Sequence, residues 1–193
     1  MDEGVVKYSC EWIAAPALPA STLAGIREWR ERCYRAELIG EYQDVGIGYG
    51  NISIRYGDHF IISGTQTGNV PDLGPEGYTE VTEADIAGNS LVCRGPVAAS
   101  SESLTHAMLY RLSPDIQAVI HVHNADMWHR MLHNVPTTGA AIPYGTPEMA
   151  GEIERLWNET DLPKQCVLAM AGHEDGIIAF GRTLEQAGKE LGL

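Results

Sequence analysis

The sequence has few of the features that mark secreted or membrane-spanning proteins. Its four cysteines, Cys10, Cys33, Cys93 and Cys166, are far apart and form no Cys-x-x-Cys pair, which argues against both a disulfide framework and a thiolate zinc site. No apolar run approaches the ~18 residues of a membrane-spanning helix, and the acidic N-terminus has no signal-peptide pattern. We therefore expect a cytoplasmic protein with reduced thiols and no membrane partner.

Basic residues are also scarce. Lys and Arg number 13 against 26 Asp and Glu, so the formal net charge is -13. Such a charge repels nucleic acid phosphates, and we expect no nucleic acid partner. It does not exclude an anionic substrate, because local donors at a helix N-terminus can overcome a distant net charge. The length of 193 residues and apolar fraction of 44% predict one compact domain over residues 1–193, of which 1–20 form an extension without an assigned place.

The predicted elements alternate between paired strands and helices. Strands are expected at 5–13, 51–55, 59–62, within 80–92, and at 118–122, 166–171 and 177–180. Helices are expected at 21–38, 100–112, 125–133, 147–157 and 183–191, with Ser21 as one N-cap. Residues 46–51 read as a glycine-rich bend and 63–79 as a loop. This order predicts a mixed α/β protein with a largely antiparallel central sheet flanked by helices.

Two histidines lie two residues apart at the end of a predicted buried strand. Side chains alternate between the two faces of a strand, so His121 and His123 project from the same face. Two neutral imidazoles on one face can chelate a borderline divalent metal such as Zn²⁺. A lone His-x-His pair is as often two packed or exposed histidines, so the pair alone leaves both interpretations open.

Two further residues favour the metal interpretation. Glu102 lies one helix upstream of the histidine pair, and His173 lies in a turn between two apolar strands. Three histidines with an adjacent carboxylate leave room on a metal for substrate oxygens. Taken singly, His173 is more simply explained as structural, and Glu102 as a residue that is favourable near the helix dipole.

The remaining histidines have competing explanations. His129 and His133 are four residues apart on a predicted helix and could chelate, but they lack the Glu of a His-Glu-x-x-His metalloprotease motif. We expect them to be surface or packing residues. His106 is one helical turn beyond Glu102, where it can orient that carboxylate or fill space below it. No role is predicted for His59.

A second set of residues suits an anion. Ser100 and Ser101 precede a predicted helix, where hydroxyls and backbone N–H groups form an anion site, although plain N-capping is the simpler local explanation. Asn51, Ser63 and Gly64 lie in or beside glycine-containing turns that also offer amides and hydroxyls, for which ordinary turn chemistry is the alternative.

Six short motifs occur in one order along the chain. They are Gly50-Asn51-Ile52-Ser53-Ile54-Arg55, Ile62-Ser63-Gly64-Thr65, Ser100-Ser101-Glu102 with His106, His121-Val122-His123, Pro143-Tyr144-Gly145-Thr146-Pro147-Glu148, and the late His173. This series, which covers residues 20–190, resembles the class II aldolase/adducin family and in particular its fuculose-phosphate aldolases. The resemblance implies a three-layer α/β/α fold.

The resemblance also implies a metal site. His121, His123 and His173 would hold Zn²⁺, or another divalent cation such as Mn²⁺, Co²⁺ or Fe²⁺. Glu102 would approach the metal when no substrate is bound and serve as the acid/base when substrate is present. Where the family usually has His-Gly, this chain reads His173-Glu174-Asp175-Gly176, so we expect two acidic residues to crowd the third ligand.

A substrate site follows from the same resemblance. The residues that would hold a substrate phosphate are Asn51, Ser63, Gly64, Ser100 and Ser101. Tyr144 would exchange a proton with the substrate carbonyl, and in this family such a tyrosine often comes from a neighbouring subunit. The resemblance therefore implies a homotetramer with active sites at subunit interfaces.

The expected reaction is aldol cleavage or condensation of a small ketose phosphate or related hydroxycarbonyl compound, through an enediolate that zinc stabilises. An epimerase, a dehydratase or a decarboxylase on the same metal scaffold is an alternative, because a fold does not fix function. A non-catalytic, adducin-like binding module is another, which loss of the metal ligands would indicate. A cupin would need many short strands and a Glu just after the histidine pair, where this chain has Asn124-Ala125-Asp126.

Overall fold

The computed structural model describes residues 5–193. Its main sheet contains the strands β1 (Ser9–Ala14), β4 (Asn51–Tyr56), β5 (His59–Ser63), β6 (Tyr78–Asp85), β7 (Ser90–Gly95), β8 (Ala118–His123), β9 (Val167–Ala169) and β10 (Gly176–Gly181). The helices are α1 (Ala20–Arg35), α2 (Ser103–Leu112), α3 (Ala125–Met131), α4 (Pro147–Glu159), α5 (Leu162–Gln165) and α6 (Leu184–Glu190), with a 3-10 turn at Pro75–Gly77.

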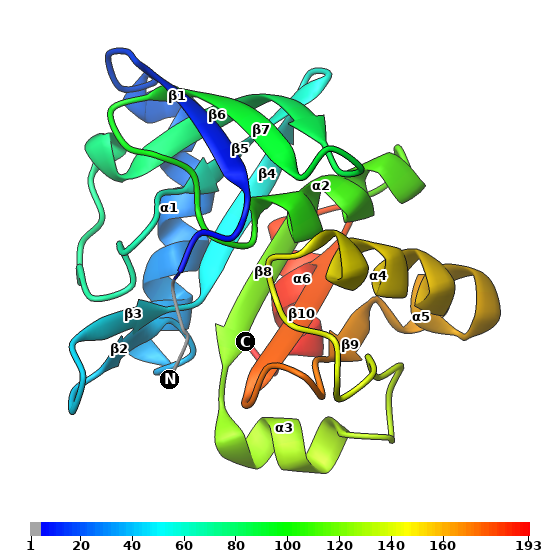
Figure 1. Cartoon of the computed structure of the whole chain (residues 1–193). Helices are drawn as coiled ribbons and strands as arrows, with labels where there is room; N and C mark the ends of the chain where they lie inside the picture. Colours follow the sequence, from blue (N-terminus) through cyan, green and yellow to red (C-terminus); the bar gives the residue numbers. More distant parts are fainter. Residues whose placement is uncertain (1–4) are drawn as a thin grey trace.

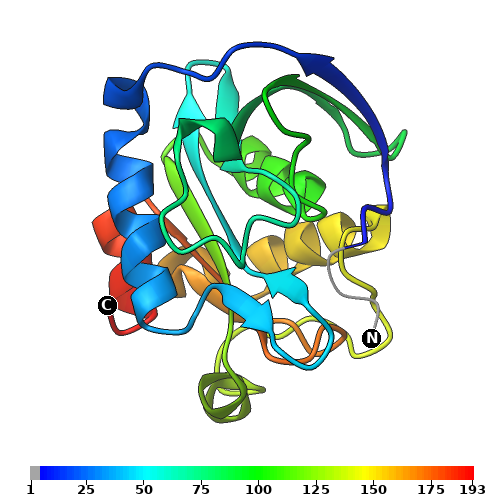
Figure 2. The ribbon, with the colours of Figure 1, turned by 90° about the vertical axis from the view of Figure 1, so that its left-hand side faces the viewer.

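The eight strands lie in the order β1-β7-β6-β5-β4-β8-β10-β9 (Figure 1). β1 pairs with β7 in parallel, and the other pairs in this sheet are antiparallel. Helices α2 and α4 lie on one side of the sheet, and α1 and α6 lie on the other (Figure 2). The prediction of a mixed, largely antiparallel sheet between two layers of helices is confirmed.

Each face of the sheet has its own hydrophobic core, and the alternation of side chains along β8 divides residues between them. Val119 packs in the core that contains Leu104 and Met108 of α2. Ile120 and Val122 pack in the core on the opposite face. Because residues two apart share a face, His121 and His123 project toward the α2 side, as the sequence predicts.

The paired strands agree with the predicted hairpins. The strands expected at 51–55 and 59–62 form the hairpin of β4 and β5, and β9 and β10 flank the turn that contains His173. Residues 46–51 depart from the prediction of a bend, because β2 (Gly40–Tyr42) and β3 (Ile47–Tyr49) form a separate two-stranded sheet. Glycines at three positions of this segment weakened its strand pattern.

Two helix starts also differ from the prediction. The N-cap of α1 is Pro19 and not Ser21, since the fixed φ of a proline is compatible with a helix entry. Helix α2 begins at Ser103 and not at Ser100, because the carbonyl oxygen of Ser100 accepts bonds from the backbone N–H and hydroxyl of Ser103. Ser100 and Ser101 therefore lie in a tight turn before the helix.

The N-terminal extension has a definite place from residue 5 onward. The strand expected at 5–13 is β1, which lies at the edge of the main sheet beside β7. Residues 1–4 of that extension lie outside the described residues.

The single-domain assignment to 1–193 stays a prediction. Between residues 5 and 193, no helix combines the length and the apolar character needed to cross a membrane.

A buried arginine fixes the loop that follows β5. The Arg30 side chain is 2% exposed, and its guanidinium donates to the carbonyl oxygens of Thr67, Gly68 and Pro71 at 2.9, 3.0 and 2.9 Å. Three acceptors satisfy a buried charged group that would otherwise be costly. Arg30 thereby anchors residues 67–71 to α1, next to the glycine-rich turns of the expected anion site.

Candidate active site

Three parts of the fold bring the four expected metal ligands together. His121 and His123 come from the end of β8, His173 from the turn between β9 and β10, and Glu102 from the residue before α2. All four side chains are at most 5% exposed. One nitrogen from each histidine lies within 4.8 Å of the others, which is a spacing that a single ion can bridge.

The carboxylate of Glu102 completes this group. Its Oε2 atom lies 2.6 Å from Nε2 of His121, and its Oε1 atom lies 3.4 Å from Nδ1 of His173. Nε2 of His121 is also 3.0 Å from Nε2 of His123. The side-chain amide of Asn51 donates to Glu102 Oε2 at 3.3 Å, so this amide holds the carboxylate from the side of β4.

The chemistry of these atoms fits a cation. Nδ1 of His121 is 3.1 Å from the carbonyl oxygen of Ile177, and a carbonyl can only accept, so this nitrogen carries the ring proton. In a neutral ring Nε2 then presents a lone pair, directly toward a carboxylate oxygen and a second imidazole nitrogen. Such a cluster needs a positive centre, which is either an additional proton or a metal ion.

The protonation preferences of the site favour metal ligation. Burial by itself raises the pKa of Glu102, but the nearby His121 and His173 outweigh it and hold that pKa well below its ordinary value. Burial, followed by the charges of His121 and His173, lowers the pKa of His123 well below its ordinary value. A carboxylate and a neutral imidazole are the ligand forms that metals require.

The β2–β3 hairpin supplies an outer contact that the sequence did not predict. The hydroxyl of Tyr42 lies 2.9 Å from Nδ1 of His123, and the ring of Tyr49 lies at a tilt to the same imidazole with centroids 5.5 Å apart. Hydrogen bonds of this kind orient a ligating histidine and fix its tautomer. No spacing rule links position 42 to position 123, so only the folded hairpin reveals the pair.

Tyr42→Phe is expected to weaken metal binding by about 10-fold or more, because His123 loses the hydroxyl that orients it. Competition with a chelating indicator measures the affinity. Tyr56→Phe is the matched control, since Tyr56 is 42% exposed and its hydroxyl has no part in the cluster. Equal affinity in the two variants would contradict a positioning role for Tyr42.

Gly176 packs against two of the ligand rings. A Cβ atom at this position would lie 3.2 Å from the His173 ring and 3.3 Å from the His121 ring. A glycine here therefore lets the turn bring His173 close to β8. Glu174 is exposed and Asp175 is half-buried, and the group of potential ligands found among residues 5–193 consists of the three histidines. The expectation that Glu174 and Asp175 crowd the third ligand stays a prediction.

Four of the five expected phosphate-binding residues surround one small cavity. Its lining includes Asn51, Gly64, Ser100 and Ser101, together with Thr65, Gln66, Thr67 and Gly68. Thr65 belongs to one of the six motifs, whereas the sequence marked Gln66, Thr67 and Gly68 only as part of a loop. The fifth expected residue, Ser63, does not line the cavity; its hydroxyl oxygen accepts a bond from the Ile52 backbone N–H at 3.2 Å.

Two features limit what this cavity binds in the present conformation. Its volume is about 20 Å³, which is room for one water molecule. The Gly64 N–H already donates to the carbonyl oxygen of Gly77 at 2.8 Å, so it is committed to the fold. A phosphate would need the loop at 65–68 to move outward, and it would meet the hydroxyls and amides of the remaining residues.

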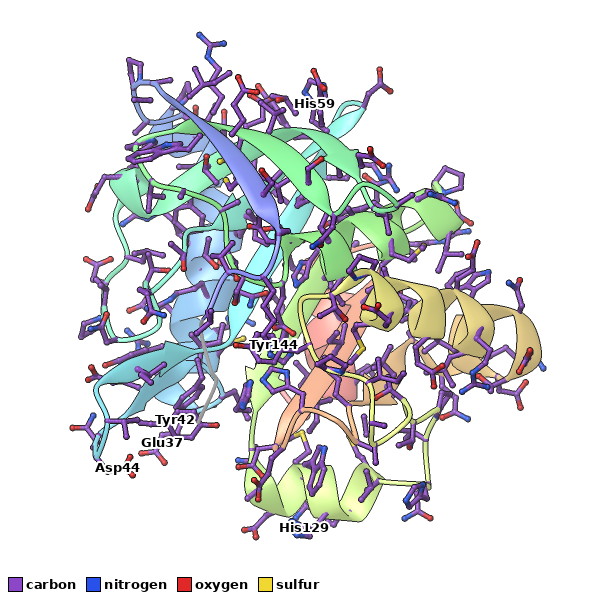
Figure 3. The ribbon with its side chains drawn as sticks, viewed as in Figure 1. Glu37, Tyr42, Asp44, His59, His129 and Tyr144 are labelled. Atoms are coloured by element: carbon purple, nitrogen blue, oxygen red, sulfur yellow. The ribbon has the colours of Figure 1, made fainter. Side chains whose placement is uncertain are left out.

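Tyr144 lies beside the metal ligands of its own chain. Its ring stacks on His173 with centroids 4.3 Å apart and an interplanar angle of 22°, and it occupies the middle of the molecule (Figure 3). Tyr144 therefore lies beside the ligand group of its own chain, and its service to a neighbouring subunit's site stays a prediction. The tight turn at Gly145, where a Cβ would lie 2.8 Å from the Ser101 carbonyl oxygen, brings Tyr144 close to the start of α2.

The other histidines are not part of the ligand group found among residues 5–193. His59 and His129 are at opposite ends of the molecule (Figure 3), and His59 pairs with Glu80 at 2.8 Å. His106 is buried below Glu102, where its Nδ1 lies 2.7 Å from the Ser53 hydroxyl. Burial is the main cause that lowers the pKa of His106 to about 3, so its ring is neutral. The ring fills space in the core and forms a hydrogen bond with Ser53.

Comparison with known proteins agrees with this geometry. Residues 30–191 match the sequence profile of the Class II Aldolase and Adducin N-terminal domain. The chain belongs to the class II aldolase/adducin family. The match includes all three histidines and Glu102, and it begins after the N-terminal segment that contains β1.

Individual members of the class II aldolase/adducin family give the same picture. The L-fuculose phosphate aldolase of Methanocaldococcus jannaschii is 39% identical over 80 residues, which span 42% of this chain and 39% of that protein. The L-fuculose-1-phosphate aldolase of Thermus thermophilus superposes with a TM-score of 0.63 at 19% identity, covering 90% of this chain and 89% of that one. An aldolase II superfamily protein from Pseudomonas syringae gives a TM-score of 0.57 at 18% identity, covering 88% of this chain and 68% of that one. These structural likenesses show a shared fold.

Proposed function

We propose that this protein is a metal-dependent lyase that cleaves or forms a carbon–carbon bond of a small ketose phosphate, or of a related hydroxycarbonyl compound, by an aldol reaction. The convergence of three buried histidines and Glu102 carries this proposal. Zn²⁺ suits a site of imidazole nitrogens with one nearby carboxylate, and Mn²⁺, Co²⁺ and Fe²⁺ are alternatives. When bound, the cation supplies a Lewis acid that polarises the carbonyl and hydroxyl oxygens of the substrate.

Glu102 is proposed as the acid/base. Its carboxylate is ionised near neutral pH, because His121 and His173 hold its pKa low. In the condensation direction it removes a proton from the carbon next to the substrate carbonyl, and in the cleavage direction it returns that proton. The amide of Asn51 donates to the same carboxylate and steers it toward the ligand cluster.

Tyr144 is proposed as the second proton-transfer group. Its ring is fixed against His173, so the Tyr144 side chain lies beside one of the ligands that would orient the substrate. In the condensation direction this hydroxyl donates a proton to the aldehyde oxygen. The phosphate of the substrate would bind the hydroxyls and amides of Asn51, Ser100 and Ser101 and of the loop at 65–68, after that loop moves outward.

The assembly and the location of the protein are part of the same proposal. Relatives named as fuculose-phosphate aldolases act on a small sugar phosphate, and a cytoplasmic homotetramer with sites near its subunit interfaces would suit such a substrate. Tyr144 of the same chain then serves each site, and the neighbouring subunit would enclose the substrate.

Product analysis with a panel of ketose phosphates tests this function. Purified protein loaded with Zn²⁺ is incubated with each compound, and the products are followed by NMR beside a chelator-treated sample and Glu102→Gln. Two shorter carbonyl products that require both the metal and Glu102 would support aldol cleavage. An isomer, a dehydrated product or released carbon dioxide would instead identify epimerase, dehydratase or decarboxylase chemistry. A metal-loaded protein without turnover on any compound would favour the binding-module alternative.

A further inference from the structure

The N-terminal segment before β1 is anchored to two parts of the active site. The Tyr8 hydroxyl donates to the carbonyl oxygen of Ser100 at 2.7 Å, and the Tyr8 side chain is buried. The amide of Asn89 donates to the Lys7 carbonyl oxygen at 2.9 Å, and the Ser9 N–H donates to the Asn89 carbonyl oxygen at 2.9 Å. These bonds fix the backbone of residues 7–9 between β7 and the turn that leads to Glu102.

The same segment reaches Tyr144. The Val5 N–H donates to the phenol oxygen of Tyr144 at 3.2 Å, and Nζ of Lys7 lies 3.7 Å from the centroid of the Tyr144 ring. His173 stacks on this ring at 4.3 Å. An imidazole and an ammonium at these distances cannot share one face of a ring, so Lys7 and His173 occupy opposite faces.

Tyr144 is therefore held on three sides. A metal-ligating histidine covers one face, a cation covers the other, and a backbone N–H fixes the phenol oxygen. An ammonium over an aromatic face is attracted by the ring quadrupole, and this attraction is stronger where water is excluded. Since Tyr144 is 4% exposed, the contact is a well-shielded one.

We infer that the segment Val5–Tyr8 is a working part of the active site, in which Lys7 and the Val5 N–H are positioning groups that hold Tyr144 against His173. The segment lies outside residues 30–191, which match the family profile. The inference rests on the proposed role of Tyr144 in proton transfer. Its geometric part, the fixing of the ring, stands independently of the reaction.

The position of a proton-transfer group strongly affects turnover, because a displacement of about 1 Å from the productive geometry can cost about 100-fold in rate. Lys7→Met is therefore expected to lower kcat by about 10- to 100-fold with little change in KM, since substrate contacts stay in place. Lys7→Arg keeps a cation that can lie over the ring and is expected to restore most of the loss. Val5→Pro removes the backbone donor and should also lower kcat, whereas Val5→Ala keeps it.

The decisive experiment measures the environment of the Tyr144 ring as well as the rate of turnover. 3-Fluorotyrosine is placed at position 144, and its ¹⁹F signal is recorded in metal-free protein for the native chain, Lys7→Met, Lys7→Arg and the control Lys164→Met, whose side chain is 82% exposed. We expect the signal to shift in Lys7→Met, to return toward the native position in Lys7→Arg, and to stay unchanged in the control. Thermal unfolding of each variant verifies that the fold is kept.

The two readouts separate this inference from the proposed function. A native-like ¹⁹F signal in Lys7→Met would overturn the positioning role, whatever the activity. A shifted signal in a protein that cleaves no ketose phosphate would uphold the positioning of Tyr144 and refute the aldol reaction. A shifted signal with native kcat would show that Lys7 positions a residue that turnover does not need, which also overturns the inference.

Discussion

Glu102→Gln is expected to lower turnover by about 10²–10⁴-fold while the protein keeps its metal. Glutamine has nearly the same size as glutamate but cannot accept a proton at neutral pH. The three histidines remain in place, because they are held by β8, by the turn after β9 and by their own hydrogen bonds. Steady-state rates and metal content measured on one preparation test both parts.

Glu148→Gln is the matched control for this variant, because Glu148 is exposed in the first turn of α4. It should retain native turnover. Native turnover in Glu102→Gln would remove Glu102 from the mechanism. Loss of the metal in Glu102→Gln would show instead that this carboxylate is a required ligand and not chiefly an acid/base.

Metal binding is expected to raise the thermal unfolding midpoint of the metal-free protein by about 8–16 °C. A ligand at a thousand-fold excess over its Kd stabilises the folded state by about 4 kcal/mol, and each kcal/mol corresponds to about 2–4 °C for a chain of this size. The effect is large because the ligands come from separate elements, β8 and the β9–β10 turn, which the ion joins. Scanning calorimetry with and without Zn²⁺ measures it.

His173→Ala should lose most of this stabilisation, whereas His129→Ala should keep it because His129 is exposed on α3 and is not part of the ligand group. The shift should also shrink as the pH falls, since protons compete with the metal for imidazole nitrogens. An equal shift in both variants would mean that the metal binds elsewhere.

Local patterns predicted the parts of the fold and site that depend on neighbouring residues. The alternation of side chains along β8 placed His121 and His123 on one face, and the structure confirms the strand. The hairpins at β4–β5 and β9–β10 followed from alternation and turn residues. Glu102 and His173 are distant in sequence, and only the resemblance to a family joined them to the pair.

Contacts that arise from tertiary packing were not predictable in the same way. Tyr42 reaches His123 because β2 and β3 pair across a segment whose glycines suggested a bend. The segment before β1 reaches the site because β1 pairs in parallel with β7, a strand far along the chain. Tyr144 was expected to serve a neighbouring subunit, which stays a prediction, and only the folded turn at Gly145 reveals that it also lies beside His173 of its own chain.

The central claim is that His121, His123 and His173 bind one divalent cation. Metal analysis of the purified native protein, beside His121→Ala and His129→Ala, tests it most directly. We predict about one zinc or other divalent ion per chain in the native protein and in His129→Ala, and almost none in His121→Ala. A native protein that holds no divalent metal, even after zinc is added and the excess removed, would contradict the claim.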